Sequence, residues 1–91
     1  MDIQVGKVTH YFSHLGVAVV ELCDELKVGD TIQILGHLTD FEQPVGSMEV
    51  NHHKILSSGP GSEVAIKVLD YVSQGDLVFR CAVDVGEKQT T

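Results

Sequence analysis

The fold of this protein is decided by the stretch from Leu26 to Gly36, which reads Leu-Lys-Val-Gly-Asp-Thr-Ile-Gln-Ile-Leu-Gly. Its first half predicts a turn, because Gly29 adopts positive φ at no steric cost and the Asp30 side chain accepts nearby backbone hydrogen bonds. In its second half two isoleucines alternate with polar residues, which is the period of a half-buried strand. A Gly-Asp turn followed by a strand returns at residues 74–79. The repeated pattern predicts an all-β module.

Further strands are predicted from alternation and from β-branched or aromatic runs, at Ile3–Phe12, Val17–Leu22, Phe41–Val50, Glu63–Leu69 and Leu77–Val83. Pro44 lacks an amide donor, so it must lie at a sheet edge or at a bulge. His52–Leu56 fits either a strand end or a single helical turn, and Ser57–Ser62 is predicted to be a loop. No long stretch has helical apolar spacing, so about six or seven short strands with Gly-rich turns predict a small closed β-barrel.

Length and composition indicate one small domain spanning residues 1–91, with its core at about 3–84 and a flexible tail at 85–91. The chain is 43% hydrophobic and has no Trp, so the core must be mostly aliphatic. No apolar run approaches the roughly 18 residues that span a membrane, and no membrane association is expected.

The two cysteines, Cys23 and Cys81, lie far apart and form no Cys-x-x-Cys pair. No apolar segment typical of a signal peptide precedes them, which favours reduced thiols and a cytoplasmic location. Packed, unreactive thiols are therefore the favoured interpretation, with a disulfide or a reactive thiol as the alternatives.

The formal net charge is −7, from 13 acidic and 6 basic side chains. Proteins that bind nucleic acid usually present a basic face, because neutralising phosphates supplies much of their affinity. Here the basic residues are scattered singly, at Lys7, Lys27, Lys54, Lys67, Arg80 and Lys88. DNA binding is not expected and RNA binding is not favoured, whereas the acidity suits solubility or a basic partner surface.

Five motifs follow one another along the chain: Val5-Gly6-Lys7-Val8, Leu26–Ile34, Val45-Gly46-Ser47-Met48, Pro60–Ile66 and Gly75-Asp76-Leu77-Val78. Together they resemble domain II of the translational GTPases, the family of elongation factor Tu. The resemblance covers about Val5 to Val83 and implies a six-stranded antiparallel β-barrel. The chain is also similar to small freestanding translation elongation factor-like proteins. A similar barrel is appended to collagenase-like peptidases.

The sequence departs from the full translation factors at two points. It has no Gly-x-x-x-x-Gly-Lys-Ser/Thr phosphate loop, so GTP hydrolysis by these residues is excluded. In elongation factor Tu, a glutamate directly before the motif methionine helps to hold the aminoacylated end of tRNA. That position is Ser47 here, so the contact does not carry over.

Neither a metal site nor a catalytic site is predicted. Five histidines occur, but adjacent ones such as His52 and His53 on a strand point to opposite faces and cannot chelate one ion together. Ser57 and Ser58 have no nucleophile-elbow context, and acidic neighbours disfavour an activated thiolate at Cys23. We therefore expect no catalytic residue and no cofactor.

The sequence predicts a non-enzymatic binding or adaptor module that contacts a protein or ribonucleoprotein partner. Its candidate partner surface is formed by His10, Tyr11, Phe12, His52 and His53. For the aromatic residues, packing at the core or rim is the competing interpretation. The alternative functions are weak binding of tRNA or rRNA, or service as an accessory barrel of a separately encoded collagenase-like peptidase.

Overall fold

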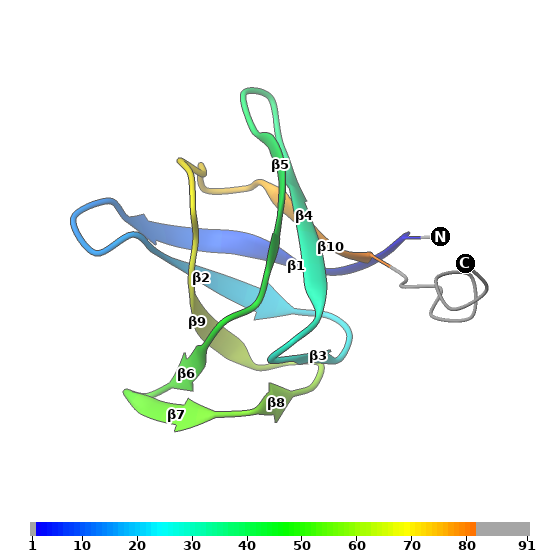
Figure 1. The fold of residues 1–91 in the computed structure, drawn as a ribbon, viewed down its shortest axis with the longest axis vertical. Helices are drawn as coiled ribbons and strands as arrows, with labels where there is room; N and C mark the ends of the chain where they lie inside the picture. Colours follow the sequence, from blue (N-terminus) through cyan, green and yellow to red (C-terminus); the bar gives the residue numbers. More distant parts are fainter. Residues whose placement is uncertain (1, 82–91) are drawn as a thin grey trace, which may run out of the picture.

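The computed structural model describes residues 2–81, which form ten β-strands and no helix. Figure 1 shows them as one strongly curved sheet with a small ribbon beneath it. The strands are β1 (Asp2–Phe12), β2 (Val17–Leu22), β3 (Leu26–Lys27), β4 (Thr31–Leu35), β5 (Asp40–Pro44), β6 (Met48–Val50), β7 (His53–Ile55), β8 (Ser57–Ser58), β9 (Glu63–Lys67) and β10 (Leu77–Cys81).

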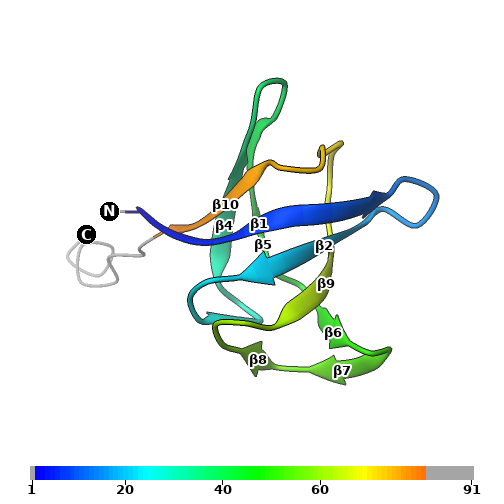
Figure 2. The same cartoon turned by 180° about the vertical axis from the view of Figure 1, so that it is seen from behind.

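The main sheet has eight strands in the order β5-β4-β10-β1-β2-β9-β6-β7, and β3 pairs with β8 in a second sheet. Every ladder is antiparallel. The longest strand, β1, lies between β10 and β2, and its register shifts once against each neighbour (Figure 2). The prediction of an all-β domain is confirmed.

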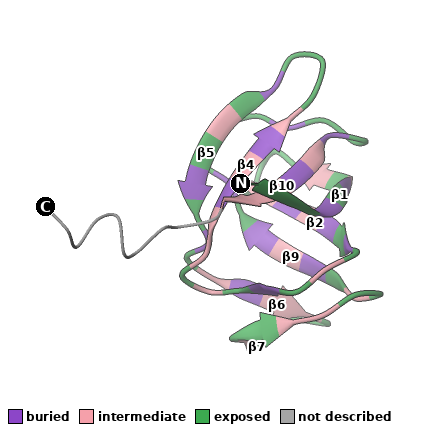
Figure 3. Ribbon diagram, turned by 90° about the vertical axis from the view of Figure 1, so that its right-hand side faces the viewer, coloured by how far each residue is buried: buried purple, intermediate pink, exposed green. Residues whose placement is uncertain are grey.

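The hydrophobic core lies inside the curve of the sheet and is aliphatic, as the composition predicts. Alternate residues of β2, β4 and β9 are buried, and Figure 3 shows the buried positions in purple along the strands. The largest fully buried side chains are Leu26, Ile32, Ile34, Met48 and Ile66, together with seven valines. Burial of these apolar side chains supplies the main favourable term in folding.

The two Gly-Asp turns have the same backbone and side-chain chemistry. Gly29 has φ of 100° and Gly75 has φ of 96°, and L-residues with a side chain rarely adopt such values. In each turn the aspartate accepts a hydrogen bond from the backbone N–H three residues earlier, at 3.0 Å for Asp30 and 2.8 Å for Asp76. The predicted turns are confirmed.

The predicted closed, six-stranded barrel is wrong. Ten strands are present, and the end strands β5 and β7 are not paired with each other in the part of the chain that the structure describes. The predicted strand Phe41–Val50 is divided into β5 and β6, because β5 ends at Pro44 on the sheet edge and the chain leaves the ladder before Met48. The open seam beside β5 is bridged instead by the side chain of Gln43.

The Gln43 side chain, only 4% exposed, takes the place of backbone pairing at this seam. Its Nε2 donates to the carbonyl oxygen of Lys67 at 2.8 Å, and its Oε1 accepts from the backbone N–H of Leu69 at 2.7 Å. One amide therefore satisfies a donor and an acceptor that a neighbouring strand would otherwise satisfy.

The segment that the sequence left open, His52–Leu56, belongs to a hairpin. Asn51 and His52 have φ of 51° and 66° and form a two-residue turn between β6 and β7. Positive φ at both central residues is typical of the tight turns that suit twisted hairpins, and Asn and His tolerate it better than most residues.

The remaining boundaries differ only locally. Part of the predicted loop Ser57–Ser62 forms β8, which pairs with β3. The predicted strand Val17–Leu22 is confirmed with the same bounds. The end of the predicted strand Leu77–Val83 and the predicted tail at 85–91 lie outside the described residues.

Candidate functional site

A groove of about 530 Å³ lies on the outer face of β2 and β9. Its floor is formed by Val17, Val19 and Ala65. On one side it is bounded by Phe12 and Leu15 of the β1–β2 hairpin, and on the other by Glu49, Asn51 and His52 of the β6–β7 hairpin, with Glu63 also in its lining. Both hairpin tips project on the same side of the molecule, the left in Figure 1 and the right in Figure 2.

Strand alternation explains why apolar side chains line this groove. In β2 the buried residues Ala18 and Val20 face the core, so Val17 and Val19 must face outward. Val19 lies opposite Ala65 of β9, and Ala65 in turn lies opposite Glu49 of β6. Neighbouring strands lie about 4.8 Å apart, so these side chains form one continuous row across the sheet.

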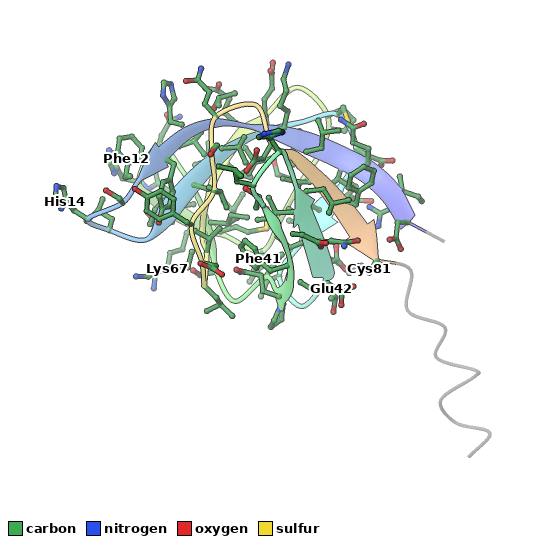
Figure 4. All side chains as sticks on the ribbon, turned by 90° about the horizontal axis from the view of Figure 1, so that it is seen from above. Phe12, His14, Phe41, Glu42, Lys67 and Cys81 are labelled. Carbon is green, nitrogen blue, oxygen red and sulfur yellow. The ribbon has the colours of Figure 1, made fainter. Side chains whose placement is uncertain are left out.

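The structure brings together three of the five predicted partner residues. Phe12 and His52 line the groove, and the His10 ring stacks on Phe12 with centroids 6.2 Å apart and an interplanar angle of 29°. Phe12 is 49% exposed and projects from the end of β1 beside the tip of its hairpin (Figure 4). These three side chains are available to a partner.

The other two predicted residues face elsewhere. Tyr11 packs against the core and meets the ring of Tyr71 edge-on at 5.1 Å. His53 is exposed but lies two residues before Ile55, which packs against the core, so both face the inner side of the β6–β7 hairpin. The prediction of one surface formed by all five residues is therefore not what the fold arranges.

Sequence reasoning missed the floor and the acidic lining of the groove. Nothing in the sequence distinguishes Val17, Val19 and Ala65 from other strand residues. Likewise, nothing distinguishes Glu49 and Glu63 from other charged surface residues. The signal that could have found the floor is the apolar run of β2, whose outward positions are also valines. Only the register of β2, β9 and β6 places the five residues together.

The prediction that both thiols are packed is wrong for Cys23, which is exposed and lies directly after β2. Cys81 is partly buried at the end of β10, and both are free thiols. Burial, followed by the nearby carboxylates of Asp2 and Glu42, raises the pKa of the Cys81 thiol above its usual value of 9.0. Figure 4 shows Cys81 beside Glu42, whose Oε2 lies 3.9 Å from Sγ. This environment disfavours the thiolate that a nucleophile or a metal ligand requires.

Within residues 2–81, no three side chains of His, Cys, Asp or Glu gather in a group that could hold a metal ion. The same residues contain one ion pair, between Lys27 Nζ and Asp30 Oδ1 at 3.3 Å, which lies in a turn away from the groove. None of the described chain forms a helix of the length and apolarity needed to cross a bilayer.

Comparison with known proteins overturns the resemblance to translation factors. Over 78 residues the chain is 37% identical to the uncharacterised protease MJ0090 of Methanocaldococcus jannaschii. The match covers 85% of this chain and 19% of that protein, so the chain spans about a fifth of the length of this curated relative. No protein family model matches the sequence.

Two crystal structures of the C-terminal domain of a U32 peptidase from Geobacillus thermoleovorans have the same fold. One superposes with a TM-score of 0.83 at 18% identity, covering 88% of this chain and 93% of that domain. The other, a selenomethionine variant, superposes with a TM-score of 0.79 at 19% identity, covering 82% and 95%.

The resemblance to domain II of the translational GTPases is therefore wrong, and with it the expected role in translation. The motifs that carried it, such as Lys27-Val28-Gly29-Asp30, are turn and strand signatures that a different antiparallel module also needs. The chain is similar in sequence to a protease and has the fold of a peptidase C-terminal domain.

Proposed function

We propose that this chain is a non-catalytic accessory module that works with the catalytic part of a U32-type peptidase. The observation that carries the proposal is the fold match, which covers 93% of a domain located at the C-terminus of such a peptidase. The 37% identity to a protease, restricted to a fifth of its length, supports the same assignment. The module then corresponds to an appended part of the larger enzyme.

The chemistry of the described side chains favours binding over catalysis. The Cys81 thiol has a raised pKa, and the Cys23 thiol donates to the backbone carbonyl oxygen of Gln4 at 3.5 Å. His10 stacks on an aromatic ring, whereas a general base is usually oriented by a carboxylate. An open apolar groove is a feature of a docking surface.

The proposal is tested with the protease of Methanocaldococcus jannaschii, prepared intact and without the region that matches this chain. Isothermal titration calorimetry should show that the full chain binds the shortened enzyme more tightly than the intact one, because the intact enzyme already carries its own module. Adding the chain should also raise peptide hydrolysis by the shortened enzyme.

The chain alone, incubated with the same fluorogenic peptide, is expected to release no more product than buffer. Hydrolysis that co-purifies with the chain and is lost in Cys23→Ser or Cys81→Ser would contradict a non-catalytic role. Absence of both binding and stimulation would overturn the accessory role itself.

A further inference from the structure

We propose that the groove between the β1–β2 and β6–β7 hairpins docks a short basic segment of the partner protein, with an apolar side chain on the floor and Lys or Arg beside it. The inference rests on the accessory function proposed above, which supplies a protein partner, and it names the chemistry that this partner presents.

The floor and one wall of the groove are apolar and accessible. Val17, Val19 and Ala65 form a continuous strip on the outer face of the sheet, and Phe12 and Leu15 overhang it with 49% and 61% of their surfaces exposed. A volume of about 530 Å³ lies within the range of roughly 300–1,000 Å³ typical of ligand clefts. An apolar side chain that fills the groove would remove this surface from water.

Among residues 2–81, the charged side chains that line the groove are Glu49 and Glu63, and no Lys or Arg lines it. Glu63 lies directly opposite Glu21 in the β2–β9 ladder, and like charges in that arrangement repel. Neither groove carboxylate makes an ion pair within residues 2–81. A cation from a partner would relieve this repulsion, which gives the groove a preference for basic segments.

The nearby lysines form no ion pair with these carboxylates in the described chain. Lys67 Nζ donates to the backbone carbonyl of Leu15 at 3.1 Å, which holds it beside the β1–β2 hairpin. Lys54 lies opposite Glu49, and Lys7 lies opposite Glu21, but neither forms an ion pair in the described chain. The net charge of −7 also favours approach of a basic segment over an acidic one.

The test uses three short acetylated peptides with the 91-residue chain. They are Lys-Leu-Val-Leu-Arg, its charge-reversed form Glu-Leu-Val-Leu-Glu, and the polar form Lys-Ser-Gly-Ser-Arg. In heteronuclear NMR titrations, only the first should shift the amide signals of Val17, Val19 and Ala65 in a saturable way. Its affinity should fall as salt rises from about 50 mM to about 500 mM, because exposed charges are screened.

The double variant Glu49→Gln/Glu63→Gln should weaken binding of the basic peptide about fivefold, the effect expected from losing two exposed ion pairs. Glu42→Gln makes the same chemical change on β5, outside the groove, and should leave the affinity unchanged. Equal binding of the charge-reversed peptide, shifts located elsewhere, or equal losses in both variants would overturn the inference.

The groove and the accessory function fail in different ways. If the shortened peptidase binds the unchanged chain and the double variant with equal affinity, the accessory function stands and the groove inference is overturned. If the basic peptide binds in the groove but the shortened peptidase does not bind, the accessory function is overturned and the preference for basic segments remains.

Discussion

At the scale of single residues, Asp76 connects two loops that are distant in sequence. Its side chain is 5% exposed, and its Oδ2 accepts hydrogen bonds from Thr39 Oγ1 at 2.5 Å and from the Ser73 backbone N–H at 2.8 Å. The β4–β5 hairpin is thereby joined to the turn that precedes β10. Gly36 makes this arrangement possible, because a Cβ there would lie 1.9 Å from Asp76 Oδ1.

Gly36→Ala should therefore destabilise the fold by about 2 kcal/mol, since the Asp76 side chain would have to leave its hydrogen bonds. The measurement is urea unfolding followed by circular dichroism in the far ultraviolet. Gly46→Ala is the matched control, because no atom of the described chain lies within 4 Å of a Cβ at Gly46 and its φ is not positive. Equal effects of the two substitutions would contradict the role assigned to Asp76.

The raised pKa of Cys81 can be measured in the variant Cys23→Ser, where Cys81 is the remaining thiol. The pH at which iodoacetamide reactivity is half-maximal should lie above that of N-acetylcysteine. Glu42→Gln should lower this pH only in part, because burial is the largest cause of the shift. A reactivity midpoint at or below that of N-acetylcysteine would contradict a raised pKa of the Cys81 thiol.

The same shift has a consequence for stability. Because folding favours the neutral thiol, the stabilisation is fully present below the pKa of the unfolded thiol. It is lost as the pH rises through the higher pKa of the folded state. The predicted loss therefore falls in the alkaline range, above the ordinary thiol value of 9.0.

At the scale of elements, the seam beside β5 shows how the curved sheet manages an edge. Pro44 is the last residue of β5 and has no N–H to donate to a further strand at this edge. The Gln43 side chain supplies the missing contacts to residues 67–69 at the end of β9. Pairing of this edge with another chain is thereby disfavoured.

Gln43→Ala should lower the free energy of unfolding by about 2 kcal/mol, because it removes two partly buried hydrogen bonds to the backbone of Lys67 and Leu69. Hydrogen exchange should show loss of protection at the Leu69 amide. Gln33→Ala on neighbouring β4 removes an exposed hydrogen bond to Asp40 and should change stability by less than about 0.5 kcal/mol. A Leu69 amide as protected in Gln43→Ala as in the natural chain would contradict the bridging role.

At the scale of the whole molecule, the sequence contained the local rules of the fold. The Gly29-Asp30 and Gly75-Asp76 turns, the alternation of β2, β4 and β9, and the aliphatic core follow from backbone sterics and from side-chain period. The Asn51-His52 turn could also have been inferred, because Asn tolerates positive φ. These features depend on residues that are close together in the sequence, so they can be predicted from the sequence.

Tertiary structure alone decided how the sheet ends and where a partner surface lies. Gln43 reaches residues 67–69, and the groove collects residues from β1, β2, β6 and β9. Each of these contacts depends on strand order and register, which turn residues and alternation leave open. The sequence by itself therefore determined an all-β chain with Gly-Asp turns, alternating strands and an aliphatic core, whereas long-range pairing determined the open seam and the acidic, apolar groove.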